Sequence, residues 1–149
     1  MAVKIDPSSV ENLQSLEAVV SGPDGANRLF TITGIAETVI GLVGTDGSQH
    51  TQKETFTLLV GPPLTQPQFR KAIAMASLTD FTWAAISGAP NQEAGSSWSV
   101  AATDADWDDE SQQVELRVDV SVSVIGLNTA AHVTRIGFQV TILAAIAGI

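Results

Sequence analysis

The chain of 149 residues lacks cysteine and tyrosine and carries little positive charge. The absence of cysteine excludes disulfides and thiolate sites. Aromatic residues make up only 5% of the chain, which argues against a platform for stacking sugars or bases. Seven Lys and Arg against 16 Asp and Glu give a net charge of −9, so we expect no nucleic-acid binding through a basic patch.

Long apolar segments are also missing. The most apolar run, Ile142 to Ile149, is far shorter than the roughly 20 residues of a membrane-spanning helix, so no membrane span is expected. The first residues show no charged n-region followed by an apolar h-region, and no classical signal peptide is predicted. These observations favour a cytoplasmic protein or one associated with a virion or another particle.

Length and composition predict one domain, 1–149, large enough to bury a real core. Hydrophobic residues account for 44% of the chain, which is ordinary for a globular protein. Only 15% of the residues are charged, and most other polar positions hold Ser, Thr, Gln or Asn. This composition is typical of a β-rich protein with short exposed faces, or of a surface that partners cover.

The clearest pattern is an unbroken alternation of apolar and polar residues after Gln113. Strict period-2 alternation with β-branched residues on one side predicts a strand with one buried face. At about 3.3 Å per residue, this strand is about 35 Å long. Its apolar members are Val114, Leu116, Val118, Val120, Val122 and Val124.

A second apolar run follows the short break at Gly126-Leu127-Asn128. We therefore predict a long C-terminal hairpin, Gln113 to Ile149, with Asn128 in the αL conformation. Pairing centred on Leu127 sets Asp119 opposite Arg135 on the exposed face. A shift of the pairing register by one residue would place the charged Arg135 on the buried face that carries the valines, which is unfavourable. The apolar members of the second run are Ile136, Phe138, Val140 and Ile142.

The rest of the chain predicts further strands and two helices. Strands are expected at Leu29–Val43, Gln52–Val60 and Leu78–Ile86, and from Trp98 onward. A first helix is predicted after Pro7, because Ser8 and Glu11 fit a capping box. Its apolar residues at helical spacing are Val10, Leu13, Leu16 and Val20.

A second helix is predicted with Pro67 in its first turn and an inner stripe of Phe69, Ile73 and Ala76. The fold class that follows is mainly β. We expect an antiparallel sheet or β-sandwich with a long C-terminal hairpin and two short α-helices packed on it, in the α+β class.

An acidic stretch, Asp104 to Glu110, is the first candidate site. Asp104, Asp106 and Asp108 have the spacing D-x-D-x-D, which offers hard oxygen ligands to Ca²⁺. The sixth position of the loop is Asp109 rather than the glycine of an EF-hand, so a solvated turn is the alternative. Trp107 among these acids suggests a contact point with another chain.

The sequence offers little that indicates catalysis. His132 is expected on the valine face, opposite Val122, as a neutral hydrogen-bonded side chain. An enzyme would need Asp80, Asp104, Asp106 and His132 brought together, and nothing in their spacing indicates this. No catalytic motif, bound cofactor or catalytic residue is therefore predicted, and we do not expect an enzyme.

The C-terminal tail carries the main functional prediction. In the proposed register, the segment after Val140 extends beyond its hairpin partner and is apolar on both sides. Such a strand belongs in a sheet that is covered on both faces. Either the Leu29–Val43 strand or a neighbouring subunit accepts it. The predicted oligomer interface consists of Ile142, Leu143, Ile146, Ile149 and Trp107.

These observations predict a structural protein that self-assembles as a homo-oligomer, with other structural proteins as further candidate partners. It would be a subunit of a particle, tube, filament or virion, with contacts through the C-terminal hairpin and apolar tail. The alternative is a small binding module that uses Asp104–Glu110 for Ca²⁺ or a basic protein partner.

Overall fold

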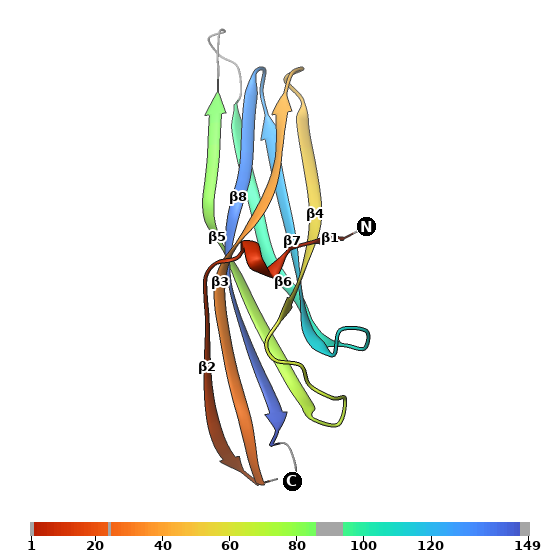
Figure 1. The fold of residues 1–149 in the computed structure, drawn as a ribbon. Helices are drawn as coiled ribbons and strands as arrows, with labels where there is room; N and C mark the ends of the chain where they lie inside the picture. Colours follow the sequence, from red (N-terminus) through yellow and green to blue (C-terminus); the bar gives the residue numbers. More distant parts are fainter. Residues whose placement is uncertain (1, 24, 86–93, 147–149) are drawn as a thin grey trace.

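The computed structural model describes residues 2–23, 25–85 and 94–146, which form a long two-layer β-sandwich (Figure 1). Sheet A has the strand order β1-β4-β7-β6, and sheet B has the order β2-β3-β8-β5. A 3₁₀ turn, η1, spans Pro7–Ser9. The strands are β1 Val3–Lys4, β2 Glu11–Gly22, β3 Gly25–Gly44, β4 Gln49–Val60, β5 Phe69–Ala85, β6 Gly95–Asp108, β7 Gln113–Ile125 and β8 Thr129–Ala145.

The hydrophobic core lies between the inner faces of the two sheets. The alternation predicted for β7 is confirmed, because the six apolar residues of the alternating set, from Val114 to Val124, are buried. The inner residues of β3 and β8, such as Phe30 and Ile142, face them from sheet B. β7 and β8 are the central strands of their sheets, which explains why they contribute most of the fully buried side chains.

The predicted hairpin between β7 and β8 is wrong. β7 pairs with β4 and β6, while β8 pairs with β3 and β5 in the other sheet. The break at 126–128 is thus an arch from one sheet to the other, and Asp119 and Arg135 lie on opposite outer faces. A hairpin and an arch bury the same apolar residues, so alternation fixes the buried face but not the partner strand. The αL prediction for Asn128 is confirmed by its φ of 54°.

The two predicted α-helices are wrong as well, and no α-helix occurs among the described residues. The first region is the single turn η1, capped by Asp6, followed by β2. The second is β5, whose alanines at 72, 74 and 76 point inward at strand spacing. The favourable helix propensity of alanine is overridden because each of these residues lies in register with the buried strand β8.

Sheet B extends beyond sheet A at one end of the molecule, the lower end in Figure 1. The segment 61–68 between β4 and β5 closes the core there, with Leu64 buried. The indole Nε1 of Trp107 donates to the carbonyl oxygen of Leu64 at 2.8 Å, and Gln113 Nε2 donates to that of Gly61 at 2.8 Å. These two hydrogen bonds join the closing segment to sheet A. β2 lies outside this closed end of the core.

Candidate assembly surface

The outer face of sheet B carries large exposed apolar side chains among polar ones. The register places Leu16, Thr31, Thr141 and Ile73 side by side across its four strands, and their neighbours Phe30 and Ile142 point into the core. Large apolar side chains on this face are more than half exposed. They are Leu16 (73%), Val39 (67%), Val43 (58%), Ile73 (59%) and Met75 (67%).

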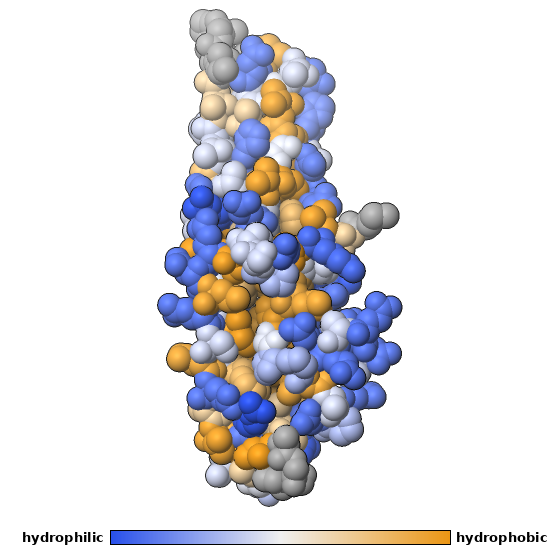
Figure 2. All heavy atoms as spheres, viewed as in Figure 1, coloured by the Kyte–Doolittle hydropathy of each residue, from blue (hydrophilic) through white to orange (hydrophobic). Residues whose placement is uncertain are grey.

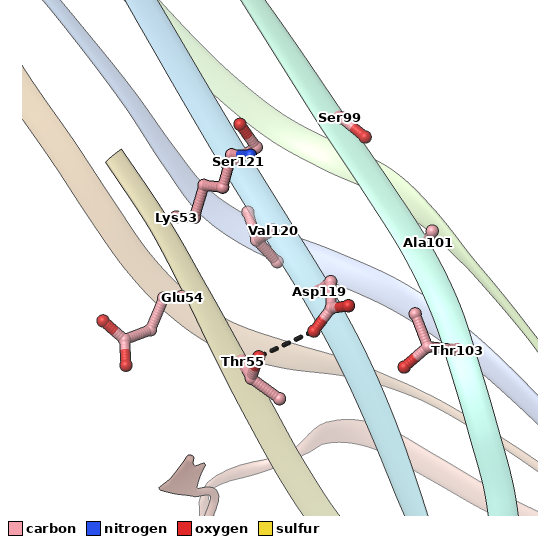
Figure 3. Close-up of a pocket in the computed structure, with 9 residues that line it drawn as sticks. All are labelled: Lys53, Glu54, Thr55, Ser99, Ala101, Thr103, Asp119, Val120 and Ser121. Carbon is pink, nitrogen blue, oxygen red and sulfur yellow. Dashed lines mark hydrogen bonds between the residues drawn. The ribbon is translucent and has the colours of Figure 1, made fainter. Parts of the chain in front are cut away.

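The outer face of sheet A has the opposite character. Small hydroxylic and charged residues line a shallow hollow of about 820 Å³. Figure 3 shows Thr55 turned toward Asp119, and the Thr55 hydroxyl donates to an Asp119 carboxylate oxygen at 2.7 Å. Ser99 and Ser121 lie on the neighbouring strands. The molecule therefore has one polar and one apolar outer face.

Strand β2 forms one edge of sheet B and is exposed along nearly its whole length. Leu13 (50% exposed) and Val19 (66% exposed) lie on the side opposite Leu16. Both acids of β2 are neutralised within the chain. Glu17 accepts from Arg28 Nε at 2.7 Å, and Glu11 lies 3.5 Å from Arg135 Nη1. The edge thus carries exposed apolar side chains and no unpaired charge.

An apolar groove of about 460 Å³ runs between β2 and the end of β4. Leu13, Phe30, Ile32 and Val60 form part of its lining. Figure 2 shows hydrophobic residues gathered along this lower half of the molecule, flanked by hydrophilic ones. Arg28 lies with its guanidinium carbon 4.7 Å from the centre of the Phe30 ring, which places a charged group at the groove. The groove suits an apolar strand or side chain with polar flanks.

The predicted tail interface is only partly available. Ile142 is fully buried, and residues up to Ala145 pair with β3, so the partner is the Leu29–Val43 strand of the same chain. Leu143 and Ile146 are half-buried, and Ile149 lies outside the described residues. Trp107 is a half-buried residue of β6 rather than an exposed turn residue. The tail is therefore part of the fold.

The predicted acidic turn is mostly strand. Asp104, Asp106 and Asp108 belong to β6, with Asp106 opposite Glu115 and Asp104 opposite Arg117. In residues 2–23, 25–85 and 94–146, no group of three His, Cys, Asp or Glu side chains is placed to hold a metal ion.

The residues of the hypothetical enzyme site are divided between the two sheets. Asp80 and His132 belong to sheet B, whereas Asp104 and Asp106 belong to sheet A. His132 was expected on the valine face but lies on the outer face of sheet B, with its ring packed over Gly41. The structure does not bring these four residues together.

A turn after β3 gathers Asp46, Ser48 and His50. His50 Nε2 lies 2.7 Å from Asp46 Oδ1 and 3.1 Å from the Ser48 hydroxyl. Because both neighbours meet the same ring nitrogen, the histidine cannot relay a proton between them as in a nucleophilic triad. The hydrogen bonds from His50 and Ser48 lower the pKa of Asp46 to about 2. These hydrogen bonds thus stabilise an exposed turn.

Comparison with known proteins adds no relative. No family model matches the chain, and no curated protein or solved structure matches it either. Within the part of the chain that the structure describes, no helix is long and apolar enough to cross a membrane. Function must therefore be argued from the surfaces themselves.

Sequence reasoning missed β2 as a surface because its apolar residues fall at positions three or four apart. In a strand, residues three positions apart point to opposite sides, so apolar and polar residues do not alternate along this segment. The signal that could have indicated β2 is the turn sequence Gly22-Pro23-Asp24-Gly25, which is typical of a tight connection between strands. Gly22 indeed pairs with Gly25 where β2 meets β3.

Proposed function

We propose that the protein is a structural subunit that assembles with copies of itself, and that the outer face of sheet B makes one of the contacts. The observation that carries the proposal is the set of large apolar side chains exposed on this one face. Groups of large exposed apolar side chains on one side of a protein often mark interaction sites. Of the tail contact expected from the sequence, Ile142 points into the core, whereas Leu143 is half-buried and belongs to this face.

Other copies of the chain are the partners that best fit this face. A contact between two copies of one face repeats the same residues on both sides, which is the commonest arrangement in homo-oligomers. The chain carries a net charge of −9, so copies repel one another wherever their charges meet. The apolar face is the part of the surface where this repulsion is weakest and where burial is most favourable.

The polar outer face of sheet A gives the assembly a side that stays in water. A long subunit with one apolar and one hydroxylic face suits a layered particle, tube, filament or virion wall. The alternative function, a binding module built on Asp104–Glu110, has less support. Its aspartates lie along a strand, and Trp107 is turned toward the core instead of a partner.

The test is the molar mass of the protein by light scattering across a concentration series. The wild-type protein should form a defined multimer or a growing polymer. Ile73→Lys combined with Met75→Lys should keep the fold and weaken assembly, because both side chains are more than half exposed.

A matched control adds the same charge to the other outer face. Ser97→Lys with Ser99→Lys places two lysines on exposed positions of β6 in sheet A. This control should assemble like the wild type. A wild-type protein that stays monomeric at every concentration would overturn the proposal, as would equal loss of assembly in both double variants.

A further inference from the structure

We infer that two copies of the chain join edge to edge through β2, around a two-fold axis that passes between the two copies of Leu16. The inference rests on the proposed function, since it names one specific interface of the same assembly. Its product is a continuous antiparallel sheet in which sheet B of one copy continues into sheet B of the other.

β2 is the sheet edge with the least protection against a partner strand. Natural edges are guarded by bulges, charges, proline or short length. β5 has three register shifts along β8, β6 has one shift and three aspartates, and β1 has only two residues. The part of β4 that β1 leaves uncovered carries Lys53 and Glu54. β2 has one register shift along β3, between Glu11 and Gln14 near its start. From Gln14 to Gly22 its pairing is regular, it has no proline or lysine, and its single charge, Glu17, is already bonded to Arg28.

One register of self-pairing matches all the exposed apolar residues of β2. A two-fold axis perpendicular to the sheet keeps both outer faces on the same side, so that even-numbered residues oppose even-numbered ones. With the axis at Leu16, this residue faces its own copy on the outer side, and Leu13 faces Val19 of the second copy on the groove side. Moving the axis to residue 17 opposes Glu17 to itself, and moving it to residue 15 opposes Leu13 to Glu17. Both shifts are unfavourable.

The groove and the direction of β2 agree with this arrangement. Leu13 lines the groove, so the side chain of Val19 from the second copy would extend its apolar wall. β2 starts beside η1, near the middle of the molecule, and runs toward the end where sheet B extends beyond sheet A (Figure 1). Antiparallel pairing therefore sends the bodies of the two copies toward opposite ends of the shared sheet, where they do not collide.

A single-cysteine variant tests the axis directly, because the natural chain has no cysteine. Opposed residues in antiparallel strands have Cα atoms about 4.5–5.5 Å apart, within the range for a disulfide. Leu16→Cys should therefore form an interchain disulfide rapidly under mild oxidation, detected as a dimer on a non-reducing gel. Ser99→Cys is the control, since this residue is also exposed but lies on the outer face of sheet A.

A charge variant tests the same interface without oxidation. Leu16→Lys opposes two lysines at the axis and should raise the dissociation constant by about tenfold or more. Ser99→Lys, on the outer face of sheet A, should leave it unchanged. Circular dichroism should show a native spectrum for both variants, since both side chains are exposed.

The outcomes separate the two proposals. An assembling wild type in which Leu16→Cys cross-links no faster than Ser99→Cys, or in which Leu16→Lys assembles normally, would overturn the β2 interface and leave the proposed function standing. A wild type that remains monomeric would overturn both. Rapid cross-linking together with loss of pairing in Leu16→Lys would establish the edge-to-edge dimer.

Discussion

Gly34 of β3 shows how a single residue limits the packing of the core. A Cβ atom added there would lie 2.7 Å from Val10 Cγ1 and 2.9 Å from Phe138 Cζ. Phe138 is 5% exposed, so its ring has little freedom to move away. Glycine is needed at this position because the buried Phe138 and the half-buried Val10 close over the backbone.

We predict that Gly34→Ala lowers the free energy of unfolding by about 1–3 kcal/mol, the usual cost of overpacking a core. Denaturant unfolding followed by circular dichroism measures this change. Gly22→Ala is the matched control, because a Cβ at Gly22 meets no atom within 4 Å. Equal effects of the two substitutions would contradict the close packing at Gly34.

The turn at Asp46 gives a prediction about pH. Its pKa is about 2, below the ordinary 3.8, chiefly because His50 and then Ser48 hydrogen-bond to the carboxylate. A carboxyl with a lowered pKa stabilises the fold above its ordinary pKa, and this contribution is lost as the pH falls from 3.8 toward 2. An NMR titration of the Asp46 carboxyl carbon should show the low midpoint.

His50→Ala should raise this midpoint toward the ordinary value without restoring it fully, since Ser48 still donates to Asp46. Asp6 is the internal control. Its pKa is lowered by hydrogen bonds from Ser8, which lies on another segment, so the His50 substitution should leave it unchanged. An Asp46 midpoint that does not respond to His50→Ala would exclude the histidine as the cause.

At the scale of elements, the arch between β7 and β8 can be told from a hairpin by two double-cysteine variants. Asp119 lies directly opposite Thr55 in sheet A, whereas Arg135 lies in sheet B. Thr55→Cys with Asp119→Cys should form an intrachain disulfide, because opposed strand residues meet its distance requirement. Asp119→Cys with Arg135→Cys should keep both thiols free. Thiol titration and mass spectrometry distinguish the cases, and the opposite result would restore the hairpin.

The sequence predicts strands well where one face alone is buried. β7 alternates without interruption, and the predicted strands Leu29–Val43 and Gln52–Val60 correspond to β3 and β4. Each of these strands packs one face on the core and exposes the other to solvent, so apolar and polar residues alternate along its sequence.

The sequence does not predict β2, the first half of β5 or the pairing of strands, although the predicted strand Leu78–Ile86 corresponds to the second half of β5. β2 is an exposed edge with apolar residues on both sides, so it lacks a strand period. The alanines of β5 favour a helix locally, and only the register with β8 makes them strand residues. Pairing depends on which sheet receives each strand, and the short breaks after β3 and β7 permit a hairpin or an arch equally well. The candidate surface was missed for the same reason, because it consists largely of β2 and β5.

For the whole molecule, net charge and apolar assembly act in opposite directions. Each copy carries a net charge of −9, so copies that approach one another repel. Salt screens this repulsion over about 10 Å at 0.1 M and leaves apolar burial intact. We predict that added sodium chloride strengthens assembly, measured as an increase in molar mass by light scattering. Assembly that weakens with salt would instead indicate an interface held by ion pairs.

The position of β7 and β8 at the centres of the two sheets has a consequence for biosynthesis. The ribosome makes β1 to β6 first, and of these only β2 with β3, and β1 with β4, can pair before the central strands appear. β5 and β6 have no sheet partner until β8 and β7 follow. A growing chain thus carries unpaired apolar strands through most of its synthesis, and it becomes a sandwich only when its last two strands insert between those already made.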